Sequence, residues 1–190
     1  EDLYLLGTFS AGNVVEVSTR LPSGSSWNGI VTVMNGAGVL VADTDGAWDG
    51  HFAGVIPADG AYYAKVMPVW GYGGHRYLVT ESGQSWASAE AYAQSLGGHL
   101  VTINDAAEQA WIQGAFSFCG YLWMGLTDEA QEGTWVWASG QPDSYRNWVS
   151  GHPYSSRDYN VAYLYIWNGY WYMGNTDWGY QALIEMEGEG

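Results

Sequence analysis

The sequence predicts an all-β sandwich over residues 1–76, followed by an α+β domain over residues 77–190. Three observations support this division. Short stretches of alternating apolar and polar residues, separated by turns with glycine or proline, occupy the first part. Two stretches with an apolar period of about 3.6 residues open the second part. The chain then returns to short strands and long loops, and its 190 residues suffice for two small domains.

The strands expected in the first part are NVVEVSTR, IVTVMN, GVLVADTD, HFAGVIP and AYYAKVMPVW. The turns between them are LPSGSS, NGAG, DGAWDG and PADG. Strands that recur about every ten residues, without a helical stretch, favour a β-sandwich.

Three phrases of this part, in their order, resemble the bacterial pre-peptidase C-terminal (PPC) family, a secreted β-sandwich. They are LGTFSAGNVVEVST, LPSGSSWNGIVTVMNGAGVLVADTDG and IPADGAYYAKV, between residues 3 and 80. The resemblance implies an accessory module without catalysis. Within it, Asp43, Asp45 and Asp49 cluster on a glycine-containing loop, as a Ca²⁺ site would require. Their spacing is not that of an EF-hand, and polar turn residues are the alternative interpretation.

Two helices are expected at the start of the second part. The first, SWASAEAYAQSLGG, is capped by Ser85 and ends at Gly97-Gly98. The second, NDAAEQAWIQGAF, is capped by Asn104 or Asp105, and Glu108 is placed for a capping box with Asp105. LVTI between the helices, and YLWMGLT and TWVWASG after them, are expected to be strands.

Four phrases, in their order, resemble the C-type lectin fold over residues 77–187. They are HLVTINDAAEQAWI, LWMGLTDEAQEGTWVWASG, SYRNWVSGHP and GYQALIEME. The third matches the pattern Y-x-N-W-x-x-G-x-P, which leads into the ligand loop of that family. A fold alone does not assign a function, so the residues at the family's calcium site must be considered separately.

In sugar-binding members a Q-P-D or E-P-N triplet after the N-W-x-x-G phrase supplies oxygen ligands to Ca²⁺. Gln141-Pro142-Asp143 precedes that phrase, and the matching position holds His152-Pro153-Tyr154. The later Glu ligand matches Asn160, and the W-N-D segment matches Trp171-Tyr172-Met173. Because Ca²⁺ requires six to eight hard oxygen ligands, we expect no calcium-dependent sugar binding at the usual site.

The charge and the isolated reactive side chains exclude several classes of function. The chain has 20 Asp and Glu against 5 Lys and Arg, a net charge of −15, which disfavours nucleic acid and anionic membranes. No apolar run approaches the ~18 residues of a membrane span. The four histidines stand outside any catalytic motif, so we expect no enzyme and no catalytic residues. Cys119, the single cysteine, is expected to be buried, with a reactive thiol or interchain bridge as alternatives.

The tyrosine-rich tail is the expected ligand-binding segment. Eight of the chain's 15 Tyr lie between residues 145 and 180. Strand alternation directs Ala162, Leu164 and Ile166 inward and their neighbours outward. The turn Asn168-Gly169 leads back to Trp171, a core position in the family pattern. The expected ligand-binding residues are Tyr145, Arg146, His152, Tyr154, Ser155, Ser156, Arg157, Tyr159, Asn160, Tyr163, Tyr165, Trp167, Tyr170, Tyr172, Asn175, Asp177, Trp178 and Tyr180.

Tyrosine among small polar residues is also the composition of antibody paratopes, where it gives large contacts at low entropic cost. We therefore expect an extracellular or cell-surface protein that binds a protein or other macromolecule without a cofactor. The pattern further resembles variable proteins of diversity-generating retroelements, which present diversified Tyr, Ser, Asn, Asp and His residues on a C-type-lectin-like fold. Three alternatives stay open: a lectin that stacks sugars on aromatic rings without metal, tyrosines that pack on the first domain, and tyrosines that form an oligomer seam.

Overall fold

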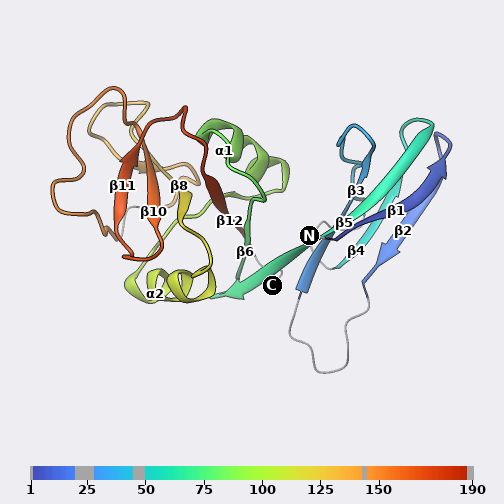
Figure 1. Ribbon diagram of the computed structural model, residues 1–190, viewed down its shortest axis with the longest axis horizontal. Helices are drawn as coiled ribbons and strands as arrows, with labels where there is room; N and C mark the ends of the chain where they lie inside the picture. Colours follow the sequence, from blue (N-terminus) through green and yellow to red (C-terminus); the bar gives the residue numbers. More distant parts are fainter. Residues whose placement is uncertain (1, 20–27, 45–49, 143–144, 188–190) are drawn as a thin grey trace. The chain divides into compact units, whose positions relative to one another are not determined.

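The computed structural model describes residues 2–19, 28–44, 50–142 and 145–187 (Figure 1). The chain divides into two compact units, Glu1–Trp70 and Gly71–Gly190. Each has its own buried apolar residues, as independent cores require.

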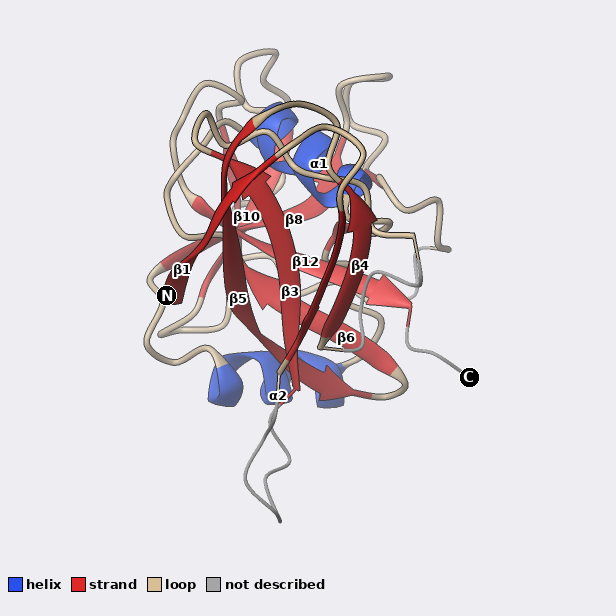
Figure 2. Cartoon of the chain, turned by 90° about the vertical axis from the view of Figure 1, so that its right-hand side faces the viewer, coloured by secondary structure: helices blue, strands red, loops and turns tan. Residues whose placement is uncertain are grey.

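The described part of the first unit is built of β-strands. β1 (Asp2–Phe9) and β3 (Asn28–Asn35) both pair antiparallel with β5 (Gly60–Tyr72). β2 (Val14–Ser18) pairs antiparallel with β4 (His51–Val55). Figure 2 shows β1, β3, β4 and β5 in this unit. Both sheets supply its core, which contains Val15, Val31, Val33, Val41, Phe52, Ile56, Tyr62 and Ala64.

The strand expected over GVLVADTD is reduced to one bridge, between Met34 and Leu40. A turn that follows β3 explains the difference. The side-chain Oδ1 of Asn35 accepts hydrogen bonds from the backbone N–H groups of Ala37 and Val39, at 2.9 and 3.0 Å. The side chain thus satisfies backbone donors that a regular ladder would have used.

Two helices of the second unit start at the expected caps. In α1 (Trp86–Ser95) Ser85 Oγ accepts from Ser88 N–H at 3.3 Å. In α2 (Ala106–Ala115) Asp105 Oδ1 accepts from Ala107 and Glu108 N–H, both at 2.8 Å. The expected capping box differs in one respect, because the Glu108 carboxylate accepts from Asn104 N–H at 2.8 Å rather than from Asp105.

The strands of the second unit form one sheet in the order β6-β12-β8-β10-β11. Their bounds are β6 (His75–Val79), β8 (Tyr121–Thr127), β10 (Val161–Tyr165), β11 (Trp171–Gly174) and β12 (Gln181–Glu187). The short strands β7 (His99–Leu100) and β9 (Val136–Trp137) pair with β12 and β8. They replace the longer strands expected over LVTI and TWVWASG. Figure 1 shows β8, β10 and β11 side by side.

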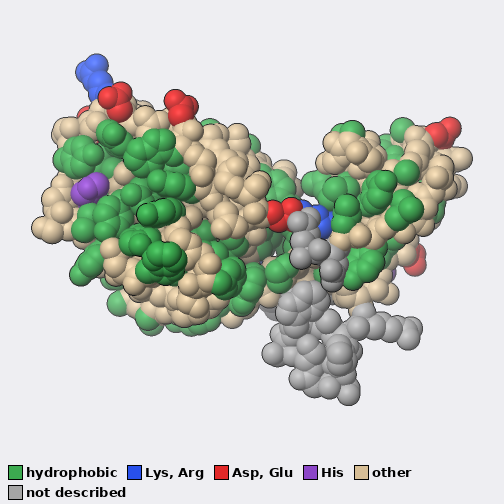
Figure 3. All heavy atoms as spheres, viewed as in Figure 1, with side chains coloured by type: hydrophobic (Ala, Val, Ile, Leu, Met, Phe, Trp, Pro, Cys, Tyr) green, Lys and Arg blue, Asp and Glu red, His purple; other side chains and the backbone are tan. Residues whose placement is uncertain are grey.

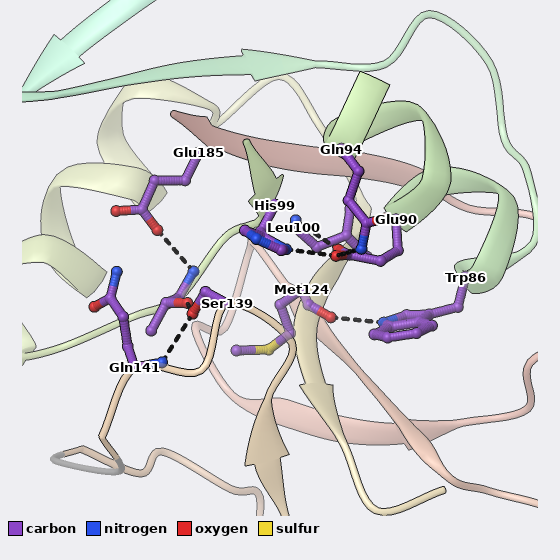
Figure 4. A network of polar contacts seen from close by, with 10 residues as sticks. Trp86, Glu90, Gln94, His99, Leu100, Met124, Ser139, Gln141 and Glu185 are labelled. Atoms are coloured by element: carbon purple, nitrogen blue, oxygen red, sulfur yellow. Dashed lines mark hydrogen bonds and ion pairs between the residues drawn. The ribbon is translucent and has the colours of Figure 1, made fainter. Parts of the chain in front are cut away.

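A buried polar network fixes the segment between the helices (Figure 4). Glu90 Oε2 accepts from Leu100 N–H at 2.9 Å, and its Oε1 lies 2.6 Å from His99 Nδ1. Glu185 Oε2 accepts from Thr102 N–H at 2.9 Å. Because β7 is only two residues long, its pairing with β12 leaves buried backbone donors at Leu100 and Thr102, and these carboxylates satisfy them.

Cys119 is a free and buried thiol, as the apolar sequence around it predicts. Burial raises its pKa to about 11, which keeps the thiol protonated near neutral pH. A protonated thiol is a weak nucleophile, so this cysteine is structural packing.

Candidate ligand-binding site

The β10–β11 hairpin separates inward from outward side chains as strand alternation predicts. Ala162, Leu164 and Trp171 are buried below 2% exposure. Tyr163 and Tyr172 are directly opposite across the two strands and are half-buried. Their rings stack with centroids 5.4 Å apart and planes 12° from parallel. The hairpin therefore displays a tyrosine pair on the side of the sheet opposite its core.

This pair is the centre of a continuous array of rings, which we call the aromatic face. Each ring in it has a neighbour whose centroid is no more than 6.4 Å away. Its members are Tyr121, Trp123, His152, Tyr154, Tyr159, Tyr163, Tyr165, Trp167, Tyr172, Trp178 and Tyr180. Figure 3 shows hydrophobic side chains gathered over the region where Figure 1 places β8, β10 and β11. A contiguous exposed patch of aromatic side chains as large as this one is normally covered by a binding partner.

Two rings of the aromatic face were missed by the sequence analysis, and both come from β8. Tyr121 is 45% exposed and stacks on Tyr165 and Tyr180 at 4.9 and 5.1 Å. Trp123 is buried and lies 4.8 Å from Tyr180, so it forms the floor of the array. The alternation of YLWMGLT places these two residues on one side of the strand, but their place in the aromatic face depends on the pairing of β8 with β10.

Tyr145 and Arg146 lie away from the aromatic face. The Tyr145 ring contacts the inward-facing Trp171 edge-on at 5.6 Å. Arg146 lies over the ring of Trp137 at 5.6 Å and donates to the carbonyl of Trp135 at 3.1 Å. Both residues therefore pack on the core side of the hairpin, although the sequence analysis grouped them with the outward residues.

The polar residues of the predicted site lie in the loops that carry the outer rings. Ser155, Arg157 and Asp177 are exposed. Ser156 N–H donates to Glu132 Oε1 at 2.8 Å, which ties its loop to the turn after β8. Asn160 Nδ2 donates to the Arg157 carbonyl at 3.0 Å. These hydrogen bonds hold the loop before β10 in one conformation.

A second loop leads from β11 to the last strand. Asn175 Oδ1 accepts from Asp177 N–H at 2.9 Å, and the Asn175 carbonyl accepts from Trp178 N–H at 3.1 Å. The turn positions Trp178 against Tyr163 and Tyr180. Tyr170 is exposed at the hairpin end, where its N–H donates to Asn168 Oδ1 at 2.9 Å.

The positions that match the family's calcium ligands bond to each other instead. His152 Nδ1 accepts from Met173 N–H at 3.1 Å, and Tyr154 N–H donates to Met173 Sδ at 3.1 Å. Burial lowers the pKa of His152, which favours the neutral imidazole that this acceptor role requires. An imidazole, a phenol, a thioether and the amide of Asn160 are not the donor set of a hard cation. These residues do not suit Ca²⁺.

A Ca²⁺ site at the aspartates of the first unit remains a prediction. Asp43 Oδ1 accepts from Ala53 N–H at 3.2 Å. Asp45 and Asp49 lie outside the described residues. Within the described ranges, no three His, Cys, Asp or Glu side chains are grouped so that they could hold a metal ion.

The phenols of Tyr163 and Tyr180 are neutral near physiological pH. Burial, followed by the neighbouring tyrosines, raises the pKa of Tyr163 to about 12. Burial also raises the pKa of Tyr180. These hydroxyls can therefore donate as well as accept hydrogen bonds with a ligand.

In the part of the chain that the structure describes, no helix has the length and apolar character needed to cross a membrane.

Comparisons with known proteins agree with this architecture. The family described as lectin C-type domain matches residues 82–182. C-type lectin domain family 4 member M of Nomascus concolor is 39% identical over 93 residues, which are 47% of this chain and 23% of that protein. C-type lectin domain family 10 member A of Homo sapiens is 42% identical over 79 residues, 40% of this chain and 24% of that protein. The chain thus spans about a quarter of these relatives.

Solved structures show the same fold. The carbohydrate-recognition domain of the mouse scavenger receptor C-type lectin superposes with a TM-score of 0.59 and 28% identity, over 64% of this chain and 96% of that one. A calcium-independent type II antifreeze protein also superposes with a TM-score of 0.59, at 21% identity, over 63% of this chain and 91% of that one. Because the family match covers more than half of the sequence, the chain belongs to the C-type lectin domain family.

Proposed function

We propose that the aromatic face binds a protein or another macromolecule without calcium. The observation that carries this proposal is the continuous array of partly exposed rings on the outer side of β8, β10 and β11. Rigid tyrosines lose little entropy when they bind, and the array is broad rather than enclosed, which suits a large ligand. The donor set at His152, Tyr154 and Met173 supports independence from calcium.

We propose binding without catalysis. His99 contacts Glu90, and His75 Nδ1 lies 3.1 Å from Glu185 Oε1, so both histidines take part in structural contacts with buried carboxylates. His152 accepts a backbone hydrogen bond. The relatives are likewise named as lectins, which are binding proteins.

Within this function, we propose that the outward residues of 144–181 vary between copies of the gene, as in variable proteins of diversity-generating retroelements. The separation of Tyr163 and Tyr172 from the buried Ala162, Leu164 and Trp171 supports the idea, because outward side chains can change without disturbing the core. Sequencing of the gene in its native population tests it. Substitutions at the outward codons alone would support diversification, and a uniform segment would refute it.

We propose that the first unit, Glu1–Trp70, is the PPC-like β-sandwich expected over residues 1–76, and that it serves as an accessory module of an extracellular or cell-surface protein. Its two antiparallel sheets with one shared core support this assignment. Expression of residues 71–190 alone tests the modular arrangement, because an accessory module can be removed without loss of binding at the aromatic face.

A carbohydrate ligand is the second candidate. Stacked Tyr and Trp rings bind the apolar faces of sugars, and one structural relative is a carbohydrate-recognition domain. Another was solved in the presence of the GlcNAc2Man3 oligosaccharide. A glycan array with a chelator present separates a metal-free lectin from a protein receptor.

The decisive experiment compares Tyr172→Ser with the intact chain on arrays of cell-surface proteins and glycans. Tyr92→Ser is the matched control, because Tyr92 is a half-buried tyrosine of α1, outside the aromatic face. We expect Tyr172→Ser to lose at least tenfold in affinity for every ligand of the face, since truncation of a hot-spot tyrosine at the centre of an interface costs about 2 kcal/mol or more. EDTA should leave that affinity unchanged. Ligands that bind both variants equally would refute the proposal.

A further inference from the structure

The second unit has a strongly one-sided charge. Residues 71–190 contain 13 Asp and Glu, three Arg and no Lys. One of the three, Arg146, is engaged with Trp137 and Trp135 on the core side of the hairpin. Among the described residues of the loops that carry the aromatic face, Arg157 is the one exposed Arg or Lys. An approaching ligand therefore meets a negative field.

Acidic side chains stand beside the rings of the aromatic face. Asp158 precedes Tyr159, and Asp177 precedes Trp178; both aspartates are exposed. Glu132 is exposed as well, and its Oε1 holds the loop through Ser156 N–H. Figure 3 shows acidic side chains at the border of the hydrophobic area, with one basic side chain next to them. The face thus has an apolar centre and acidic side chains along one edge of its border.

The rings themselves favour cations. The face of an aromatic ring is the negative end of its quadrupole, so ammonium and guanidinium groups bind over it. The raised pKa values of Tyr163 and Tyr180 keep these rings as neutral phenols, and the lowered pKa of His152 keeps a positive charge out of the array. A guanidinium that stacks on a tyrosine can also pair with a carboxylate at the border.

We propose that the partner of the aromatic face is a basic protein surface, which presents arginine and lysine to the rings and to the bordering carboxylates. This inference rests on the proposed function and specifies its ligand. Charge complementarity supports this proposal. An acidic protein, a phosphorylated segment or an anionic glycan would be repelled by the acidic residues. A basic surface is attracted at long range, and its arginine and lysine side chains can give up water to lie against the rings.

The test measures binding of a peptide of alternating Arg and Ser residues by titration calorimetry, with a Glu-Ser peptide of equal length as the probe of opposite charge. The Arg-Ser peptide should bind and the Glu-Ser peptide should not. Tyr163→Leu combined with Tyr172→Leu keeps the net charge but removes two ring faces. This variant should bind the Arg-Ser peptide about tenfold more weakly, because cation–π contacts contribute roughly 0.5–2 kcal/mol each.

Charge variants test the border and do not depend on the fold of the leucine variant. Asp158→Asn with Asp177→Asn should weaken peptide binding severalfold, whereas Arg157→Gln should strengthen it. Glu16→Gln with Glu187→Gln changes the net charge equally at exposed positions outside the aromatic face, and its effect should be small.

Two results would overturn the inference. In the first, the Arg-Ser peptide binds the leucine variant and the intact chain equally, which would mean general attraction to an acidic protein. In the second, neutral or acidic proteins, glycans or phosphatidylcholine vesicles bind in a Tyr172-dependent manner while the Arg-Ser peptide does not. The second result would leave the proposed binding function standing and remove only the basic partner, so the two failures are distinguishable.

Discussion

Replacement of Trp171 by Phe tests how the core supports the aromatic face. Trp171 has no solvent exposure, and its Nε1–H donates to Gln109 Oε1 at 2.7 Å. Gln109 is also buried, and its Nε2 donates to the Gly169 carbonyl at 3.2 Å. Trp171→Phe therefore leaves a buried carbonyl oxygen without its donor, and it also removes part of a ring that Trp137 contacts edge-on.

The two losses can be estimated separately. An unpaired buried acceptor costs about 1–3 kcal/mol. Trp→Ala substitutions in cores cost about 3–5 kcal/mol, and we assign roughly a third of that to the smaller change from Trp to Phe. We therefore expect Trp171→Phe to lower the free energy of unfolding by about 2–4 kcal/mol. The midpoint of thermal unfolding should fall by about 3–5 °C for each kcal/mol in a unit of this size.

Urea unfolding of a double-mutant cycle isolates the hydrogen bond. Gln109→Leu alone leaves the Trp171 N–H unpaired, but the double variant leaves neither partner of this bond behind. The two substitutions should thus be less destabilising together than their sum, by about 1–2 kcal/mol. A cost below about 1 kcal/mol for Trp171→Phe, or strict additivity, would show that this bond does not anchor β11.

Further predictions concern pH and close backbone contacts. Burial lowers the pKa of His152, so its contribution to stability is present above the ordinary imidazole pKa of about 6.5 and is lost as the pH falls through the lower folded-state value. His152→Gln should flatten this loss in urea unfolding curves measured as the pH is lowered from about 7. Burial raises the pKa of Glu185 to about 7, so its contribution is present below about pH 4.3 and is lost as the pH rises through about 7. Glu185→Gln should remove this pH dependence of the free energy of unfolding. An unchanged pH dependence would mean that a different group takes up the proton. A Cβ on Gly125 would lie 2.6 Å from the Leu100 carbonyl, so Gly125→Ala should cost more than about 2 kcal/mol. Gly120→Ala, with no atom within 4 Å of the added Cβ, should cost far less; equal costs would contradict the argument.

Local patterns of the sequence predicted the features that depend on one element at a time. Alternation correctly assigned Ala162 and Leu164 to the core side of β10, because side-chain direction in a strand has a strict period of two. The caps at Ser85 and Asp105 were also predicted, because a cap depends on a few neighbouring residues. The C-type lectin fold followed from the order of four phrases, and the family match supports it.

Features that depend on pairing between distant segments could not be predicted in this way. Tyr121 joins the aromatic face only because β8 pairs with β10, with Tyr121 opposite Tyr165. Tyr145 was grouped with the ligand residues by composition, but its ring packs on the core side of Trp171. Glu108 was expected to complete a local capping box, yet its Oε1 also accepts from the hydroxyl of Tyr77 at 2.7 Å. In each case a contact with a segment far away in the sequence decided the role of the residue.

The contact between His152 and Met173 explains how the loop can be ordered without a metal. Here the loop is joined to β11 by the hydrogen bond from Met173 N–H to His152 Nδ1 and by the contact of Tyr154 N–H with Met173 Sδ. These bonds use the backbone of β11 and leave the ring of Tyr172 on the outer side, next to Tyr163 and His152. The chemistry of the aromatic face can therefore change at the outward positions, provided that the small set of contacts beneath it is kept.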